Sequence, residues 1–198
     1  MIIAVDGPAA AGKGTIARAL ATHFGYHFLD TGALYRMVGL AVIRSARDPA
    51  DTGAAIAAAT SLDPSGFADR DLRTEAVGAA ASIVAVVPEV RSALLSLQRD
   101  FARKQPGAVL DGRDIGTVVC PDADVKLYVT ASPEVRASRR QKELGAASYA
   151  DVLAEIKARD LRDSQRVTAP LLPAKVRSSL PCEPGARNAR DSSAHASQ

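Results

Sequence analysis

The chain has 198 residues, enough for one compact domain with a buried core. Hydrophobic residues make up 47% of it and charged residues 24%, which is ordinary for a globular protein. The formal net charge of +3 is too small to indicate a nucleic acid as partner, although an excess of arginine suits a protein that handles phosphates.

The cysteines and histidines show no metal-binding spacing, and Cys120 and Cys182 are best interpreted as reduced thiols. No run of about 18 apolar residues predicts a membrane span. The chain starts directly with Ile2-Ile3-Ala4-Val5, without the basic region of a signal peptide. We therefore expect a cytoplasmic location, no membrane partner and a monomer.

The first half of the chain alternates short apolar runs with stretches of helical periodicity, separated by glycine and by Asp-Pro. Residues 50–66 are rich in alanine and then turn-like around 63–66. In chain order we predict a strand at 2–5, a helix at 13–24, a strand at 26–29, and helices at 33–44, 73–87 and 88–103.

The second half continues the alternation until its last segment. Ser132-Pro133 is typical of a helix start, and that helix should stop near Gly145. Residues 175–198 have no period of 2 or 3.6, and we predict an aberrant, disordered tail there. The remaining predicted elements are strands at 108–110 and 125–129 and a last helix at 151–162, so the whole pattern indicates an α/β fold with a parallel sheet.

A glycine-rich run separates the first strand from the first helix, the context that a phosphate-binding P-loop requires. Glycines let backbone N–H groups point at phosphate oxygens, and the helix dipole adds to their effect. The lysine brings positive charge toward the β and γ phosphates. A plain glycine-rich turn is the alternative, which a lysine at this offset disfavours. The predicted ATP-binding residues are Gly7, Pro8, Ala9, Ala10, Ala11, Gly12, Lys13, Gly14 and Thr15.

A hydroxyl, a phenol and a guanidinium follow the second strand, at Thr31, Tyr35 and Arg36. Tyr35 lies one helical turn beyond Thr31, so these groups can face one site. The same residues also fit an N-cap threonine followed by an amphipathic helix, and the two interpretations are compatible.

The segment Asp111-Gly-Arg-Asp-Ile-Gly-Thr117 follows a central strand. Asp111 at a strand end suits Mg²⁺ held through water. Arg113 can bind a phosphate with two hydrogen bonds, and Asp114 can accept hydrogen bonds from a base or sugar. A loop with two turn glycines is the alternative, and the P-loop upstream argues against it.

Two arginine-rich helical stretches flank Gly145. A solvated helix face is the usual explanation of such charges. Two charged helices joined by a glycine-containing loop instead indicate a lid that carries positive charge to the triphosphate. The residues concerned are Arg136, Arg139, Arg140, Arg159, Arg162, Asp163 and Arg166.

Taken together, these motifs resemble the bacterial cytidylate kinase family over about residues 1–174. Adenylate kinases share the Gly-Lys-Gly-Thr turn but not the Asp-Gly-Arg-Asp-x-Gly-Thr run. The resemblance rests on Asp6-Gly-Pro, Gly12-Lys-Gly-Thr15, Asp30-Thr-Gly-Ala-Leu-Tyr-Arg36, Leu72-Arg-Thr74, Pro88-Glu-Val-Arg91, Asp111 to Val119, and Arg159-Asp-x-Arg-Asp-x-x-Arg166-x-x-Ala-Pro170.

The resemblance implies a three-layer α/β/α P-loop kinase fold. It also implies a nucleoside monophosphate kinase domain at 1–174, with a CMP-binding region at about 31–105 and a lid at about 136–162. The implied reaction moves the γ-phosphoryl group of ATP to CMP or dCMP with Mg²⁺. A kinase for AMP or UMP, and an unspecified P-loop NTPase, remain alternatives.

The resemblance also implies individual residue roles. The acceptor phosphate side is assigned to Thr31, Tyr35, Arg36, Arg113 and Arg166, the cytosine to Ser82, Arg91 and Asp114, and the pentose to Arg159 and Asp163. The catalytic set is Lys13, Arg113, Arg139, Arg159 and Arg166, and the metal set is Asp111 (through water) and Thr15.

The chain departs from the family pattern in two places. Residues 62–73 are short where the family often carries a β-rich insert. After Ala174 the family continues with a strand and a closing helix, which we expect to be missing or replaced here, as a frameshift would produce. A chain altered in this way could bind nucleotide and yet turn over poorly.

Overall fold

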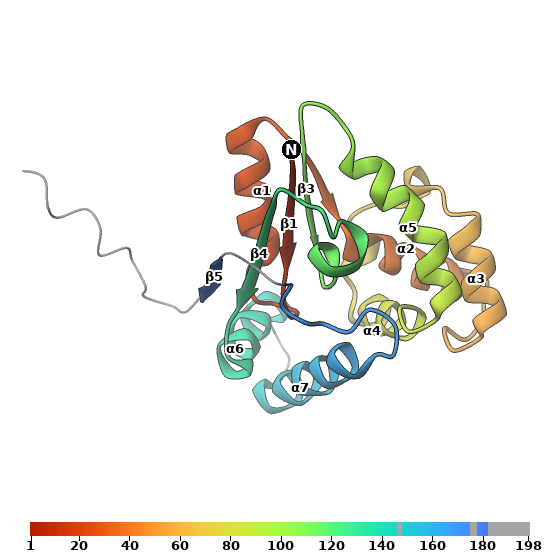
Figure 1. Cartoon of the computed structure of the whole chain (residues 1–198). Helices are drawn as coiled ribbons and strands as arrows, with labels where there is room; N and C mark the ends of the chain where they lie inside the picture. The colour runs from red at the N-terminus through yellow and green to blue at the C-terminus, as the bar shows by residue number, and fades with distance from the viewer. Residues whose placement is uncertain (146–147, 175–177, 182–198) are drawn as a thin grey trace, which may run out of the picture.

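The computed structural model describes residues 1–145, 148–174 and 178–181. Strands and helices alternate along the chain, as the sequence predicts (Figure 1). The strands are β1 (Ile2–Asp6), β2 (His27–Asp30), β3 (Ala108–Gly112), β4 (Val125–Thr130) and β5 (Ser178–Pro181). The helices are α1 (Lys13–Phe24), α2 (Thr31–Arg44), α3 (Thr52–Thr60), α4 (Glu75–Val84), α5 (Pro88–Ala102), α6 (Pro133–Leu144) and α7 (Tyr149–Gln165).

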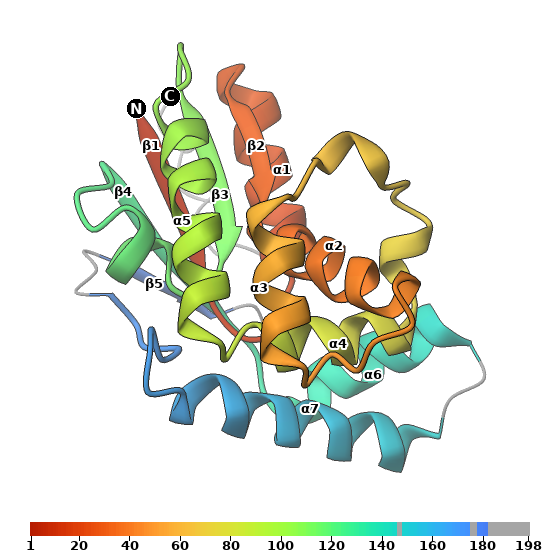
Figure 2. The same cartoon turned by 90° about the vertical axis from the view of Figure 1, so that its right-hand side faces the viewer.

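The strands form one parallel sheet in the order β2-β3-β1-β4-β5. Asp30 is in register with Asp111, and Asp6 with Gly112, so these three strands end at the same level. Helices α6 and α7 lie beyond these carboxyl ends in both views (Figures 1 and 2). Ligands of parallel sheets bind at this edge.

Side chains on the two faces of the sheet belong to separate core clusters, because successive strand residues point to opposite faces. Ile3 and Val5 of β1 pack with Ala17 and Ala21 of α1. Ala4, between them, packs with the cluster on the α5 side. Figure 1 shows α1 and α5 on opposite sides of the sheet, so the predicted three-layer fold is confirmed.

Helices α2, α3, α4 and α5 form a helical subdomain beside the sheet, around a core that includes Val38 and Leu94. Gly39 of α2 makes the closest approach there, since a Cβ at this position would come 2.9 Å from the Ala80 Cβ of α4. Among the described residues, no single helix is long and apolar enough to cross a membrane. The pair α4 and α5 passes such a test only when joined across a bend of 101°.

Helix α3 was not predicted as a helix. Its sequence Thr-Gly-Ala-Ala-Ile-Ala-Ala-Ala-Thr contains one large side chain, so it carries almost no periodic signal. Alanine has the highest intrinsic helix propensity, and Asp51 caps the start by accepting a hydrogen bond from the Ala54 N–H at 3.0 Å. Propensity and capping therefore indicate this helix better than hydrophobic spacing does.

Strand β5 lies within the segment where the sequence predicts a replaced ending. Residues 178–181 pair in parallel with β4 and occupy the edge of the sheet, so the divergent ending replaces a strand there. Parallel pairing uses backbone groups, and it can form without alternating side chains. The rest of the predicted tail, residues 175–177 and 182–198, lies outside the described part of the chain.

Candidate active site

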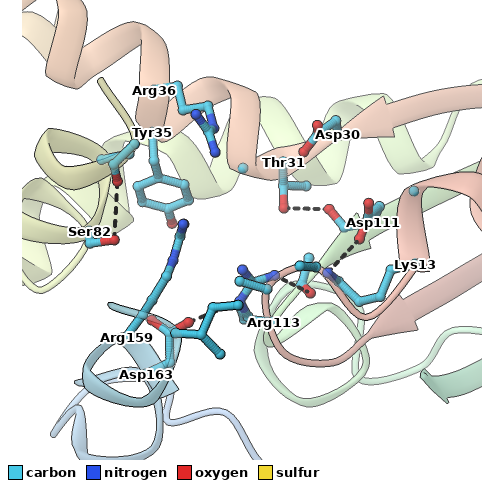
Figure 3. Close-up of a pocket in the computed structure, with 18 of the residues that line it drawn as sticks. Lys13, Asp30, Thr31, Tyr35, Arg36, Ser82, Asp111, Arg113, Arg159 and Asp163 are labelled. Atoms are coloured by element: carbon cyan, nitrogen blue, oxygen red, sulfur yellow. Dashed lines mark hydrogen bonds and ion pairs between the residues drawn. The ribbon is translucent and has the colours of Figure 1, made fainter. Parts of the chain in front are cut away.

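A cavity of about 800 Å³ opens at the carboxyl ends of the strands. Residues from the P-loop, α2, α4, α5, the segment after β3, α6 and α7 line it. Figure 3 shows those of the P-loop, α2, α4, the segment after β3 and α7 around the cavity. Every residue predicted to bind the acceptor lies there, namely Thr31, Tyr35, Arg36, Ser82, Arg91, Arg113, Asp114, Arg159, Asp163 and Arg166. Their proximity is observed, whereas their individual roles stay predictions.

The loop between β1 and α1 contains residues in the left-handed region, with φ of 146° at Gly7 and 93° at Gly12. A Cβ on Gly7 would lie 1.9 Å from the Val129 carbonyl oxygen, so only glycine fits against β4. Gly7, Pro8 and Ala11 are not among the described residues that line the cavity. The other predicted ATP-binding residues line the cavity, namely Ala9, Ala10, Gly12, Lys13, Gly14 and Thr15.

Lys13 is 6% exposed, and its Nζ donates to the Pro8 carbonyl oxygen at 3.2 Å. The same atom lies 3.5 Å from Asp111 Oδ1. Burial, with the nearby Arg113 charge adding to it, lowers the pKa of Lys13 to about 8. One carbonyl and one carboxylate therefore hold the lysine at the loop, and an anion with more negative charge could replace the carbonyl contact.

Asp111, the next-to-last residue of β3, lies beside that lysine and is 7% exposed. Burial raises the pKa of its carboxyl group, against the opposing charge of Lys13. Within the described residues its Oδ1 accepts no hydrogen bond and has only the ion pair with Lys13. A buried carboxylate oxygen in this state can accept a hydrogen bond from a water molecule on a cation.

Thr31 does not cap helix α2. Its Oγ1 donates to the Asp111 carbonyl oxygen at 2.8 Å, which ties α2 to β3. Asp30 is the N-cap, with its side chain accepting from the Ala33 N–H. The capping interpretation of Thr31 was wrong because an aspartate one residue earlier takes that position, and Asp30 itself lines the cavity.

Arg113 and Asp163 pair across the cavity, with Arg113 Nε donating to Asp163 Oδ2 at 3.0 Å (Figure 3). Burial opposes the charge of Arg113, yet Asp163 outweighs it and raises the pKa of the guanidinium. Arg159 also reaches into the cavity from α7, and burial lowers its pKa to about 10. Arg113 and Asp163 therefore offset part of each other's charge.

Arg159 Nε and Arg166 Nη2 are buried and make no hydrogen bond within the described part of the chain. An unmet buried donor costs free energy, and one on a charged group costs more. Arg36 contributes a further guanidinium, whose Nη1 donates to the Leu72 carbonyl at 2.8 Å. Two unmet cationic donors in one cavity indicate an anionic ligand with several oxygens.

The far end of the cavity holds a second buried pair, Arg91 with Asp114. Arg91 also lies 5.6 Å from the ring centre of Tyr35. Ser82 donates to the Gly78 carbonyl oxygen at 3.2 Å and lines the same end. This end offers donors, acceptors and an aromatic ring, which suits a polar heterocycle rather than a phosphate.

Helices α6 and α7 are attached to the phosphate loop by arginines. Arg136 is 2% exposed, and its Nη1 donates to the Ala9 carbonyl at 3.2 Å and to Asp160 of α7 at 2.9 Å. Arg139 Nη1 donates to the Ala11 carbonyl at 3.3 Å. Sequence spacing placed both arginines on one helix, but their carbonyl partners depend on tertiary contacts.

Comparisons with known proteins agree with this geometry. The family model described as cytidylate kinase matches residues 3–179. A cytidylate kinase from Rhodospirillum rubrum is 59% identical over 179 residues, covering 86% of this chain and 84% of that protein. One from Bradyrhizobium diazoefficiens is 56% identical over 178 residues, covering 88% and 84%.

Among solved structures, an uncharacterised protein from Eubacterium ventriosum superposes with a TM-score of 0.53 at 12% identity. The superposition covers 91% of this chain and 87% of the Eubacterium ventriosum protein. At 12% identity it supports only the fold. The matched residues extend from β1 through α6 and α7 and include every cavity-lining motif. The chain therefore belongs to the cytidylate kinase family.

Proposed function

We propose that this protein transfers the γ-phosphoryl group of ATP to CMP or dCMP, giving CDP or dCDP and ADP. One observation carries the proposal: a single cavity joins the lysine of a phosphate loop to buried arginine donors that lack partners among the described residues. The relatives named above are cytidylate kinases, which identifies the acceptor base.

The donor triphosphate occupies the loop at residues 7–15 in this proposal. Backbone N–H groups and the α1 dipole bind its oxygens, and Lys13 exchanges its Pro8 contact for the β and γ phosphates. Thr15 is exposed and lines the cavity, so its hydroxyl is available beside them. Arg139, tied to the same loop through the Ala11 carbonyl, adds positive charge from α6.

The acceptor nucleotide lies opposite. Arg36, Arg113 and Arg166 bind its phosphate together with the Thr31 hydroxyl and the Tyr35 phenol. Asp114, Arg91 and Ser82 face the cytosine, and Arg159 with Asp163 reach the pentose. The support is that both unmet donors, Arg159 Nε and Arg166 Nη2, belong to residues that line the same cavity as the phosphate loop and Tyr35.

Mg²⁺ fits the residues present. Magnesium in kinases is held by few protein groups together with phosphates and water, so a dense ligand cluster is not required. Among the described residues no group of three or more His, Cys, Asp or Glu forms such a cluster. Asp111 through water and the Thr15 hydroxyl would hold the ion, which would neutralise charge on the β and γ phosphates.

The acceptor is already an anion, so the reaction needs positioning and charge neutralisation rather than a strong base. Arg36, Arg113 and Arg166 orient the attacking phosphate oxygen, while Lys13 and Arg139 stabilise charge on the transferring group. The lid at about 136–162 closes toward the CMP-binding region at about 31–105 and excludes water. One chain supplies both sides of the cavity, which supports a monomer, and the substrates suit a cytoplasmic location.

A coupled assay of ADP formation with CMP, dCMP, UMP and AMP tests the proposal. We expect CMP and dCMP to be turned over at least about a hundredfold more efficiently than AMP, because the polar end must match the acceptor's hydrogen-bonding groups. Equal turnover of AMP would reassign the acceptor, and hydrolysis of ATP without any acceptor would contradict the transferase activity.

A further inference from the structure

The turn at Ile115–Val119 directly follows two acceptor-site residues, Arg113 and Asp114. It is a π-helical turn in which the N–H groups of Val118 and Val119 donate to the Asp114 carbonyl at 2.9 and 3.1 Å. The first N–H groups and last carbonyls of a helical turn have no partner within it. The partners of those groups therefore decide where Arg113 and Asp114 stand.

Asp6, the last residue of β1, binds the amino end of this turn. Its Oδ1 accepts from the Ile115 N–H at 2.8 Å and its Oδ2 from the Gly116 N–H at 2.7 Å. The Asp6 side chain is buried, with 3% of the residue exposed, and the contact spans 109 positions of sequence. One carboxylate thus accepts from the first two N–H groups of the turn at once.

Asp114 occupies the N-cap position, where an aspartate usually caps with its own side chain. Here its side chain makes no capping bond within the described residues and pairs with Arg91 instead. Asp6 therefore supplies the cap from another strand, which leaves the Asp114 carboxylate available to the cavity.

Arg99 of α5 binds the carboxyl end of the turn. Its Nη2 donates to the Val118 carbonyl at 3.1 Å and its Nε to the Val119 carbonyl at 3.0 Å. A negative group at the amino end and a positive group at the carboxyl end both match the direction of the peptide dipoles. The turn is therefore held at its two ends by opposite charges.

Close packing leaves the turn little room to shift. A Cβ on Gly116 would lie 3.3 Å from Asp6 Oδ2 and 3.2 Å from Lys126 Cδ. A Cβ on Gly112 would lie 2.7 Å from Thr31 Oγ1. Tight packing of this kind transmits a change at the cap to the residues beside it.

We infer that Asp6 and Arg99 are positioning residues, which hold the 115–119 turn so that Arg113 and Asp114 meet the acceptor nucleotide. This inference rests on the proposed function, because it takes CMP as the acceptor. Neither side chain is among the described residues that line the cavity. Asp6 directly precedes the phosphate loop, so one strand end sets the donor loop and the acceptor turn relative to each other.

Asp6→Asn tests the inference. The amide keeps the shape of the side chain but places an N–H where one oxygen accepted, so one backbone donor loses its partner. We expect the KM for CMP to rise about tenfold while the KM for ATP changes by less than about twofold. An unchanged KM for CMP, or an equal rise in both, would overturn the inference.

Asp124→Asn is the matched control. Asp124 Oδ2 accepts the Ile2 N–H at 2.6 Å at the opposite end of β1, so this change weakens a similar bond to the same strand. Both substitutions can lower the melting temperature. Only Asp6→Asn should raise the KM for CMP, which separates positioning from general stability.

Amide hydrogen exchange of residues 113–119 in the nucleotide-free protein provides a readout that does not involve CMP. Exchange should become faster in Asp6→Asn and stay unchanged in Asp124→Asn, and equal exchange in all three proteins would overturn the inference. Wild-type turnover of CMP reports separately on the proposed function, so the two failures are distinguishable.

Arg99→Met keeps the test decisive if Asp6→Asn does not fold. Methionine removes both donors to the last carbonyls, and we expect the KM for CMP to rise about fivefold. Arg99→Lys should recover part of this loss because it keeps the charge and one donor. If Arg99→Met binds CMP as well as the wild type does, the inferred role of Arg99 is wrong.

Discussion

The two sides of the cavity are built differently. The proposed donor side is one loop of consecutive residues, 7–15, most of which line the cavity. The acceptor side takes single side chains from α2, α4, α5, the segment after β3, and α7. A short loop needs only local sequence to form, whereas the acceptor side exists only when those elements pack together.

The cations of the two sides also differ. The donor side relies on Lys13, whose pKa burial lowers to about 8. On the acceptor side Arg113 and Arg91 each pair with a carboxylate, Asp163 and Asp114 respectively. A guanidinium keeps its charge when buried and binds in a fixed orientation, while an ammonium is mobile and loses its proton more readily. Buried arginines therefore suit a site that must hold an anion in one orientation, and carboxylates fix two of them here.

Lys13→Ala gives the largest expected effect on the donor side. Removing this charge should lower kcat by about two orders of magnitude or more, because loss of one transition-state contact has that cost. The measurement is ADP formation at saturating ATP and CMP. Lys157→Ala, which removes a lysine 3.6 Å from Glu134 on the exposed faces of α6 and α7, is the control and should leave kcat unchanged. Near-normal turnover of Lys13→Ala would refute its assignment.

Arg91→Ala and Asp114→Ala separate the two sides. Each should raise the KM for CMP about thirtyfold and the KM for ATP less than about threefold, because each leaves a buried charge of the cytosine end unpaired. The loss of CMP binding free energy in the double variant should be smaller than the sum of the two single losses, since the residues form one ion pair. Arg103→Ala, at the exposed end of α5, is the control. An equal rise in the KM for CMP and the KM for ATP would show that the two sides of the cavity are not independent.

The low pKa of Lys13 predicts a pH dependence confined to the donor side. Below about pH 8 the ammonium is charged, and above it the charge is lost, so kcat/KM for ATP should fall about tenfold per pH unit above 8. In the unfolded chain this lysine keeps its proton until about pH 10.5. The free energy of unfolding should therefore rise as the pH increases from about 8 to 10.5, because the buried lysine has already lost its charge in the folded state.

A pH profile of kcat/KM from pH 7 to 10 checks this expectation. Lys13→Arg keeps its charge throughout that range, and whatever activity it retains should not fall above pH 8. A wild-type profile that stays flat to pH 10 would mean that Lys13 keeps its proton in the free enzyme.

Periodicity and turn residues in the sequence were sufficient to predict most elements. Ser132 caps α6 as expected, by accepting from the Val135 N–H at 3.3 Å, and Pro133 begins that helix. Helix α3 and strand β5 were not predicted, because neither has an alternating or helical apolar pattern. Hydrophobic spacing reports burial, and it is uninformative where residues are small or pairing uses only the backbone.

Sequence alone determined the phosphate loop, since Gly7, Gly12 and Lys13 act within a few residues of one another and the required backbone bends are properties of the residues themselves. The sequence also identified the arginines that line the cavity. Only the tertiary structure decided their partners: Asp163 for Arg113, Asp160 for Arg136, and Asp6 for the turn that carries Asp114. Electrostatic pairing depends on distance in space, and these partners, which are 24, 50 and 109 positions apart in sequence, meet only after the chain has folded.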